Sequence, residues 1–179
     1  MVLRECPSQV LSALEALGIS LERISARALP VHVEAHDLVV AERGENGQEH
    51  LLTPAAAAAW TRLTAAARND GVNLGIASAF RSLERQIEIV RRKLESGLSI
   101  DAVLSASAPP GFSEHHTGRA VDVTTSDCSL LDVAFSRTEA FRWLTIHAQK
   151  FGFALSYPEG NAYGYAYEPW HWCFQETEG

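Results

Sequence analysis

Apolar residues recur at helical spacing in four parts of the chain. Near the start, Val10, Leu14 and Leu17 fall on one helical face, and a glycine ends the pattern. Farther along, Thr53 and Pro54 provide an N-cap and a first-turn proline for an alanine-rich segment. The pattern predicts helices over residues 7–18, 53–69, 82–97 and 138–150.

Short runs of β-branched and aromatic residues between these helices predict strands. The first run, residues 31–40, is followed by the polar turn 42–50 and by Leu51 and Leu52, which together favour a hairpin. The proline-containing segment 99–112 is expected to be a loop. Further strands are predicted over residues 73–80, 119–124, 153–157 and 170–174.

Strands and helices are mixed without a regular βαβ alternation. This order predicts an α+β fold, with a small, mainly antiparallel sheet and flanking helices. The chain has 179 residues, of which 46% are hydrophobic and 21% charged. Such a length and composition suit one compact globular domain.

The net charge, the apolar runs and the cysteine spacing limit the possible partners, the location and the redox state of the chain. A net charge of −7 argues against a nucleic-acid binder, and no apolar stretch approaches the roughly 18 residues of a membrane span. Glu5 and Pro7 interrupt any export signal, so a cytoplasmic location is expected, with the cell envelope as the alternative if a leader was removed. Cys6, Cys128 and Cys173 are widely spaced, so we expect three free thiols.

Two polar segments far apart in the sequence, SEHHTGRAVD and YEPWHW, contain residue types suited to metal-assisted hydrolysis. A catalytic zinc ion usually takes three protein ligands and keeps a fourth position for water. His115, Asp122 and His171 could supply the three ligands. Gly118 permits a tight turn between the first two, which would let a loop residue and a strand residue converge.

Two further residues complete the expected chemistry. Glu168 is the candidate general base, because a carboxylate must accept the proton of the attacking water. Pro169 disfavours a helix there, so a bend is needed to bring Glu168 and His171 toward one metal ion. Arg81, at the junction of a predicted buried strand and a helix, is the candidate for stabilising the oxyanion.

Three segments resemble motifs of the VanY-type D-alanyl-D-alanine carboxypeptidases, in the same order, across residues 78–172. They are SAFRSLERQ, SEHHTGRAVDV and YEPWHW. The resemblance implies one zinc ion held by His115, Asp122 and His171 on the sheet of a VanX/VanY-like peptidase fold.

The same resemblance assigns roles to the neighbouring residues. It implies that Glu168 is the catalytic base and that Arg81 stabilises the oxyanion. It also implies that Ser113 and Gln86 lie near the bound peptide, and that Tyr165 lines the pocket.

Other histidines offer competing interpretations. His116 is adjacent to His115 and is expected to point away from the metal ion. His32, Glu34 and His36 would share one face of the predicted strand 31–40, where they could bind a metal ion. A solvated polar strand face is the favoured interpretation of these three.

The predicted helix 82–97 carries several basic residues besides the candidate Arg81. They are interleaved with Glu84 and Glu88, which favours a solvated helix face. These basic residues are Arg85, Arg91, Arg92 and Lys93.

The resemblance implies a zinc-dependent D,D-carboxypeptidase that hydrolyses the C-terminal D-Ala of peptidoglycan stem peptides or their precursors. The alternatives are a cytoplasmic L,D-carboxypeptidase acting on muropeptide tetrapeptides in recycling and a non-catalytic module that uses the zinc scaffold to bind peptides. The expected partner is a stem peptide or muropeptide, with neither nucleic acid nor membrane insertion. We expect residues 1–179 to form one domain, with a helix and hairpin in 1–52 and the catalytic core in 53–179.

Overall fold

The computed structural model describes residues 6–44, 47–126, 128 and 131–175. The helices are α1 (Ser8–Ala16), α2 (Leu21–Ala26), α3 (Pro54–Asn69), α4 (Leu83–Glu95), α5 (Ile100–Ala106) and α6 (Glu139–His147), with the 3-10 helices η2 (Glu114–Thr117), η3 (Val133–Arg137) and η4 (Ala148–Phe151). The strands are β1 (Val39–Arg43), β2 (Glu49–Leu52), β3 (Gly75–Ser78), β4 (Ala120–Thr124), β5 (Phe153–Leu155) and β6 (His171–Phe174).

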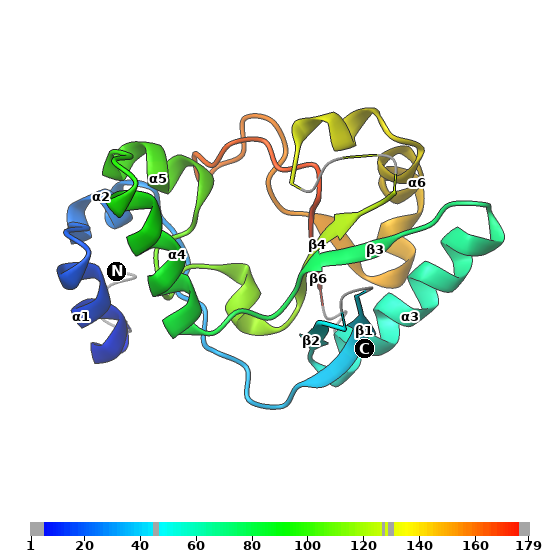
Figure 1. The fold of residues 1–179 in the computed structure, drawn as a ribbon, viewed down its shortest axis with the longest axis horizontal. Coiled ribbons are helices and arrows are strands. Elements are labelled where there is room, and N and C mark those ends of the chain that lie inside the picture. The colour runs from blue at the N-terminus through cyan, green and yellow to red at the C-terminus, as the bar shows by residue number, and fades with distance from the viewer. Residues whose placement is uncertain (1–5, 45–46, 127, 129–130, 176–179) are drawn as a thin grey trace.

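The main sheet has four strands in the order β3-β4-β6-β5, and every neighbouring pair is antiparallel. Strands β1 and β2 form a separate antiparallel hairpin. Helices α1, α2, α4 and α5 gather at one end of the molecule, whereas α3 and α6 lie with the sheet at the other end (Figure 1). The predicted α+β class, with a small antiparallel sheet and flanking helices, is confirmed.

The prediction of a loop over residues 99–112 is wrong for its first half, which forms α5. The Ser99 hydroxyl accepts a hydrogen bond from the Ala102 backbone N–H, which caps the helix. Val103 and Leu104 are buried against the N-terminal helices, so packing stabilises a helix that is too short to be detected by its periodicity. Helix α2 was not predicted either.

The strand predicted over residues 31–40 begins only at Val39, so His32, Glu34 and His36 do not share a strand face. A Glu34 carboxylate oxygen accepts a hydrogen bond from the Leu83 backbone N–H at 2.7 Å. A carboxylate at this position complements the positive N-terminal end of α4. Within the described part of the chain these three residues do not group as metal donors, and Glu34 has a structural role instead of a solvated one.

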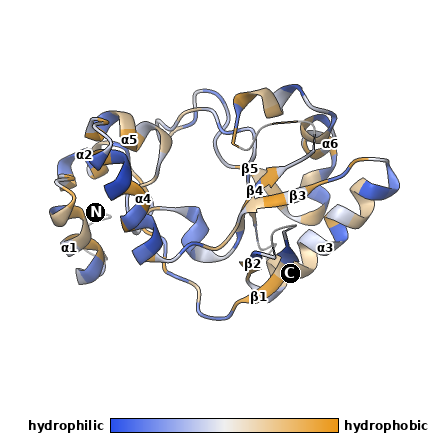
Figure 2. Cartoon of the chain, viewed as in Figure 1, coloured by the Kyte–Doolittle hydropathy of each residue, from blue (hydrophilic) through white to orange (hydrophobic). Residues whose placement is uncertain are grey.

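Two clusters of buried apolar residues hold the fold together. One lies between the sheet, α3 and α6, and hydrophobic residues run along β3 in Figure 2. The other joins α1 and α2 to α4, α5 and the segment that carries Tyr157 and Tyr165. The site described below lies between these two clusters.

Several smaller predictions can also be compared with the structure. Cys6, Cys128 and Cys173 are free thiols, as predicted. The Ser82 hydroxyl caps α4 by accepting from the Arg85 backbone N–H. Within the described residues, no helix is both long and apolar enough to cross a membrane.

Candidate metal centre and cleft

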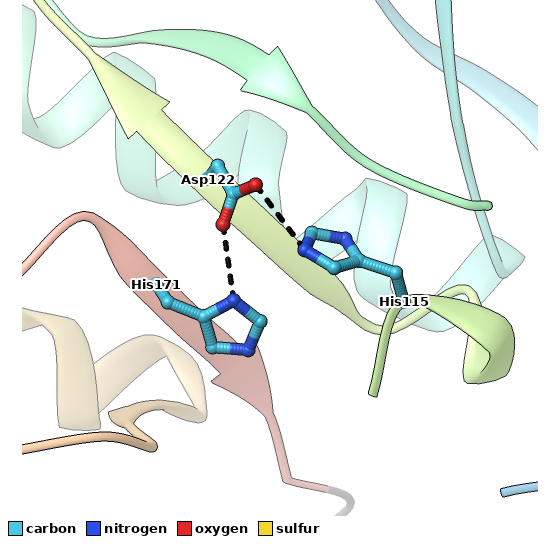
Figure 3. Close-up of side chains that lie close together, drawn as sticks. All are labelled: His115, Asp122 and His171. Carbon is cyan, nitrogen blue, oxygen red and sulfur yellow. Dashed lines mark hydrogen bonds and ion pairs between the residues drawn. The ribbon is translucent and has the colours of Figure 1, made fainter. Parts of the chain in front are cut away.

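Asp122 and His171 are brought together by the pairing of two strands. They are direct partners in the antiparallel register of β4 and β6, so their side chains are neighbours on one face of the sheet. His115 approaches from η2, just before β4, and the three side chains converge (Figure 3). Asp122 Oδ2 lies 3.2 Å from His115 Nε2, and Asp122 Oδ1 lies 3.0 Å from His171 Nδ1.

The turn between His115 and Asp122 depends on Gly118. Its φ of 63° lies in the left-handed region, which glycine adopts without strain. A Cβ atom at this position would come within 2.8 Å of Leu38 Cδ2. The backbone conformation is therefore the main reason for glycine here, and a larger residue would also have to displace the end of the Leu38 side chain.

The imidazole of His115 has a fixed orientation. Its Nδ1 lies 2.7 Å from the Ala79 carbonyl oxygen, which can only accept a hydrogen bond. Nδ1 therefore carries the proton, and Nε2 is left as the metal donor facing Asp122. Burial lowers the pKa of His115, which favours the neutral form that a metal ligand requires.

The imidazole of His171 is held by Glu114, which the sequence analysis did not single out. His171 Nε2 lies 2.9 Å from Glu114 Oε2, and the Ser156 hydroxyl donates to the same oxygen at 2.6 Å. A carboxylate on Nε2 leaves Nδ1 free to act as the donor toward a metal ion. Glu114 stands next to His115 in the sequence, but only the folded chain shows that it contacts His171.

Charged neighbours and burial shift the pKa values of this cluster in opposite directions. Burial alone would lower the pKa of His171, but hydrogen bonds with Asp122 and Glu114 outweigh it and raise the pKa to about 10. Burial also opposes ionisation of Glu114, yet its bonds to His171 and Ser156 lower its pKa to about 2. The pKa of Asp122 is held well below its usual range, because the two histidines outweigh its burial.

The donor set fits a zinc ion. One donor atom from each of His115, Asp122 and His171 can be chosen so that all three lie within 4.8 Å of one another. Zinc–ligand distances of about 2.0–2.2 Å place neighbouring donors of a tetrahedral site roughly 3.3–3.6 Å apart, close to the distances from Asp122 to each histidine. Two imidazoles and one carboxylate are also a common ligand set of catalytic zinc.

Glu168 lies beside this donor set. The His171 backbone N–H donates to the Glu168 carbonyl at 3.1 Å, which closes a turn through Pro169 and Trp170 and provides the bend that the sequence required. Glu168 Oε2 lies 3.9 Å from His171 Nδ1, and its side chain is 17% exposed. Burial raises the pKa of Glu168 to about 7, near the range that suits a general base.

Arg81 reaches the same cleft and is held by two neutral side chains. Its guanidinium donates to Gln86 Oε1 at 2.9 Å and to Ser78 Oγ at 3.0 Å, and lies 3.8 Å from Asp122 Oδ2. Gln86 is fully buried, and its amide nitrogen donates to the Ala108 carbonyl at 2.6 Å. Gln86 is not among the residues that line the cleft, and its side-chain oxygen anchors the Arg81 guanidinium there.

The cleft around these residues has a volume of about 440 Å³. Ser113 and Tyr165 line it together with the three donor residues, Arg81 and Glu168. The Tyr165 hydroxyl is buried and makes no hydrogen bond within the described structure. The Arg27 guanidinium carbon lies 4.3 Å from the centre of the Tyr165 ring.

His116 is turned away from the donor set, as expected. Its Nδ1 lies 2.7 Å from the Arg81 carbonyl oxygen, and its Nε2 accepts from the Gly111 backbone N–H at 3.1 Å. His116 therefore links two loops that border the cleft.

The fold and the cleft place the chain among small α+β peptidases with a candidate metal centre on an antiparallel sheet. The family model described as VanY, D-alanyl-D-alanine carboxypeptidase, matches residues 49–177, and the chain belongs to this family.

Proteins similar to this chain include a D-alanyl-D-alanine carboxypeptidase and an LD-carboxypeptidase. A D-alanyl-D-alanine carboxypeptidase of Enterococcus faecalis is 35% identical over 123 residues, which cover 63% of this chain and 44% of the relative. The chain spans about half the length of the curated relatives it matches, 55% and 44% for the first two.

Two solved structures support the same relationship. The LdcB LD-carboxypeptidase is similar with a TM-score of 0.72 and 32% identity, over 81% of this chain and 71% of that one. A mutant of the VanY D,D-pentapeptidase from the VanB-type resistance cassette, in complex with Zn(II), gives a TM-score of 0.60 and 29% identity, over 80% and 79% of the two chains.

Replacing Glu114 with glutamine is expected to weaken zinc binding by about 10–100-fold, the usual effect of losing a carboxylate behind a ligating histidine. The amide can still occupy the space, but it cannot hold the His171 Nε2–H as firmly as the carboxylate does. Competition with a chelating dye measures the affinity. Glu95→Gln, at an exposed position, is the control, and equal affinities of the two variants would contradict the role given to Glu114.

Proposed function

We propose that the chain is a zinc-dependent carboxypeptidase that removes the C-terminal D-alanine from peptidoglycan stem peptides or their precursors. The observation that carries the proposal is the convergence of His115, Asp122 and His171 in a cleft that also contains Glu168 and Arg81. The Zn(II) complex of the related VanY structure supports the choice of metal.

Each residue of the cleft has a distinct role in the proposed hydrolysis. A zinc ion bound by the three donors supplies Lewis acidity to the scissile carbonyl and acidifies a nearby water. The Glu168 carboxylate accepts the proton of the attacking water and returns it to the leaving amine. The Arg81 guanidinium, held by Gln86, stabilises the negative charge that develops on the carbonyl oxygen. Ser113 and Tyr165 contact the peptide on the cleft walls.

An L,D-carboxypeptidase acting on tetrapeptides is the second candidate. The LdcB LD-carboxypeptidase, with its TM-score of 0.72, favours it. Both candidates use the same residues, because both hydrolyse the amide bond before a C-terminal D-alanine. They differ in the residue that precedes this bond, which is D-alanine in the first case and the third, L-configured residue of the stem peptide in the second.

A non-catalytic module that binds peptides on the zinc scaffold is a candidate from a different class. Such a module has no need of a base or an anion-stabilising group. The half-buried Glu168, with its pKa near 7, and the anchored Arg81 both argue against it.

The test is to incubate the zinc-loaded protein with defined tri-, tetra- and pentapeptides and to weigh the products. Release of one D-alanine from the pentapeptide alone supports the D,D assignment. Release from the tetrapeptide alone supports the L,D candidate. If no peptide loses D-alanine, the carboxypeptidase proposal fails.

A further inference from the structure

Lys93 does not belong to the solvated helix face on which the sequence pattern placed it. It is half-buried and lines the cleft that contains the metal donors and Glu168. Ile89 lines the same cleft one turn earlier, and residues four apart lie on the same face of a helix. The last turn of α4 therefore presents a cation to the cleft.

No acidic side chain within the described residues forms an ion pair with Lys93. Its Nζ donates to a neutral partner, the Ser107 hydroxyl, at 2.5 Å. Arg85 and Arg92, on the same helix, both lie within ion-pairing distance of Glu88. Lys93 therefore differs from Arg85 and Arg92, because no acidic side chain of the described residues lies within ion-pairing distance of its ammonium group.

The surroundings of Lys93 disfavour its charged form. Burial lowers the pKa of Lys93, and so does the charge of Arg81, while Glu168 acts in the opposite direction. Two cations thus influence one another in the cleft of a chain whose net charge is −7. A charged group that is partly removed from water is stabilised by an opposite charge, so an anion is the natural occupant of the space beside Lys93.

The cleft has room for a peptide with two charged contact points. Gln86, which anchors Arg81, and Lys93 are seven residues apart on α4, which corresponds to two turns or about 10 Å along the helix. A stem peptide carries its terminal carboxylate close to the scissile bond. Some stem peptides carry a second carboxylate on a side chain farther from it, as diaminopimelate does.

We propose that Lys93 binds a carboxylate of the peptide substrate and so contributes to substrate selection. The inference rests on the proposed function for the identity of the ligand as a peptide. The carboxylate belongs either to the C-terminal residue or to a side chain that precedes the scissile bond, and the two sources predict different results.

The experiment measures binding without turnover, by calorimetry on zinc-loaded protein that carries Glu168→Gln. Two pentapeptides ending in D-Ala-D-Ala are compared, with either lysine or diaminopimelate as the third residue. Lys93→Met is expected to weaken binding by about 10–100-fold, the usual range for a lost charge-assisted hydrogen bond. Lys93→Arg should restore most of the affinity, and Arg92→Met, at a side chain 68% exposed, is the control.

Each outcome has a definite meaning. Equal weakening for both peptides assigns the terminal carboxylate to Lys93, whereas weakening for the diaminopimelate peptide alone assigns the side chain. Affinities that match those of Arg92→Met for both peptides overturn the inference. Turnover by protein with Glu168 intact is measured separately, so binding that depends on Lys93 without any turnover would refute the proposed function and not this contact.

Discussion

Glu168→Gln is expected to lower kcat/KM by about 10²–10⁴-fold, the usual contribution of a positioned general base. Glutamine keeps the shape of the side chain but cannot accept a proton at neutral pH. Glu168 has the position for this role, because its carboxylate lies beside the three donors without being one of them. The variant should therefore keep its zinc while it loses turnover.

Release of D-alanine from defined peptides measures the rate, and metal analysis of the same samples measures the zinc content. Glu95→Gln serves again as the matched control at an exposed carboxylate. Undiminished activity of Glu168→Gln would show that another group acts as the base. Loss of zinc together with activity would instead make Glu168 a support of the metal site.

Binding of zinc at the proposed site is expected to produce the second large effect. With free zinc at about 1,000 times its dissociation constant, binding adds about 4 kcal/mol to the free energy of unfolding. For a chain of this length, that corresponds to an increase in Tm of roughly 8–16 °C. Asp122→Asn should abolish most of this increase, because it removes the single anionic donor, which contacts both histidines.

Thermal unfolding with added zinc, and again with excess chelator, measures the increase. Asp37→Asn, at an exposed aspartate in the segment before β1, is the control and should show the full zinc effect. An Asp122→Asn protein that is stabilised by zinc as strongly as the control would exclude Asp122 from the metal site.

The three candidate metal donors could be selected from the sequence because each lies in a short, distinctive segment. Their meeting in space could be predicted only through the family resemblance, since the pairing of β4 with β6 joins residues 49 positions apart. Glu114 lies inside one of the same segments, but its partner Ser156 is in a loop with no motif of its own. No local pattern indicates that contact.

The position of Lys93 and the formation of α5 could not be predicted from local sequence patterns, because both depend on tertiary packing. Lys93 lies among arginines and glutamates that do form a solvated face, and only the fold directs it into the cleft. Helix α5 is seven residues long and is stabilised by tertiary burial, which periodicity does not detect. The resemblance implies that Gln86 lies near a bound peptide, but its bonds to Arg81 and to the Ala108 carbonyl are visible only in the fold.

The apolar cluster that joins α1 and α2 to α4 and α5 extends beyond the part of the chain that matches the family. The segment that matches the family begins at residue 49, but α1 and α2 lie before it. Directly after α2, Arg27 donates to the carbonyls of Leu104 and Tyr163, both at 2.7 Å, next to the side of the cleft that carries Tyr165. In a fragment limited to the matching segment, the apolar residues of this cluster around Tyr165 would be exposed to water. A fusion protein that carries the cleft is therefore expected to need α1 and α2 as well as the segment that matches the family.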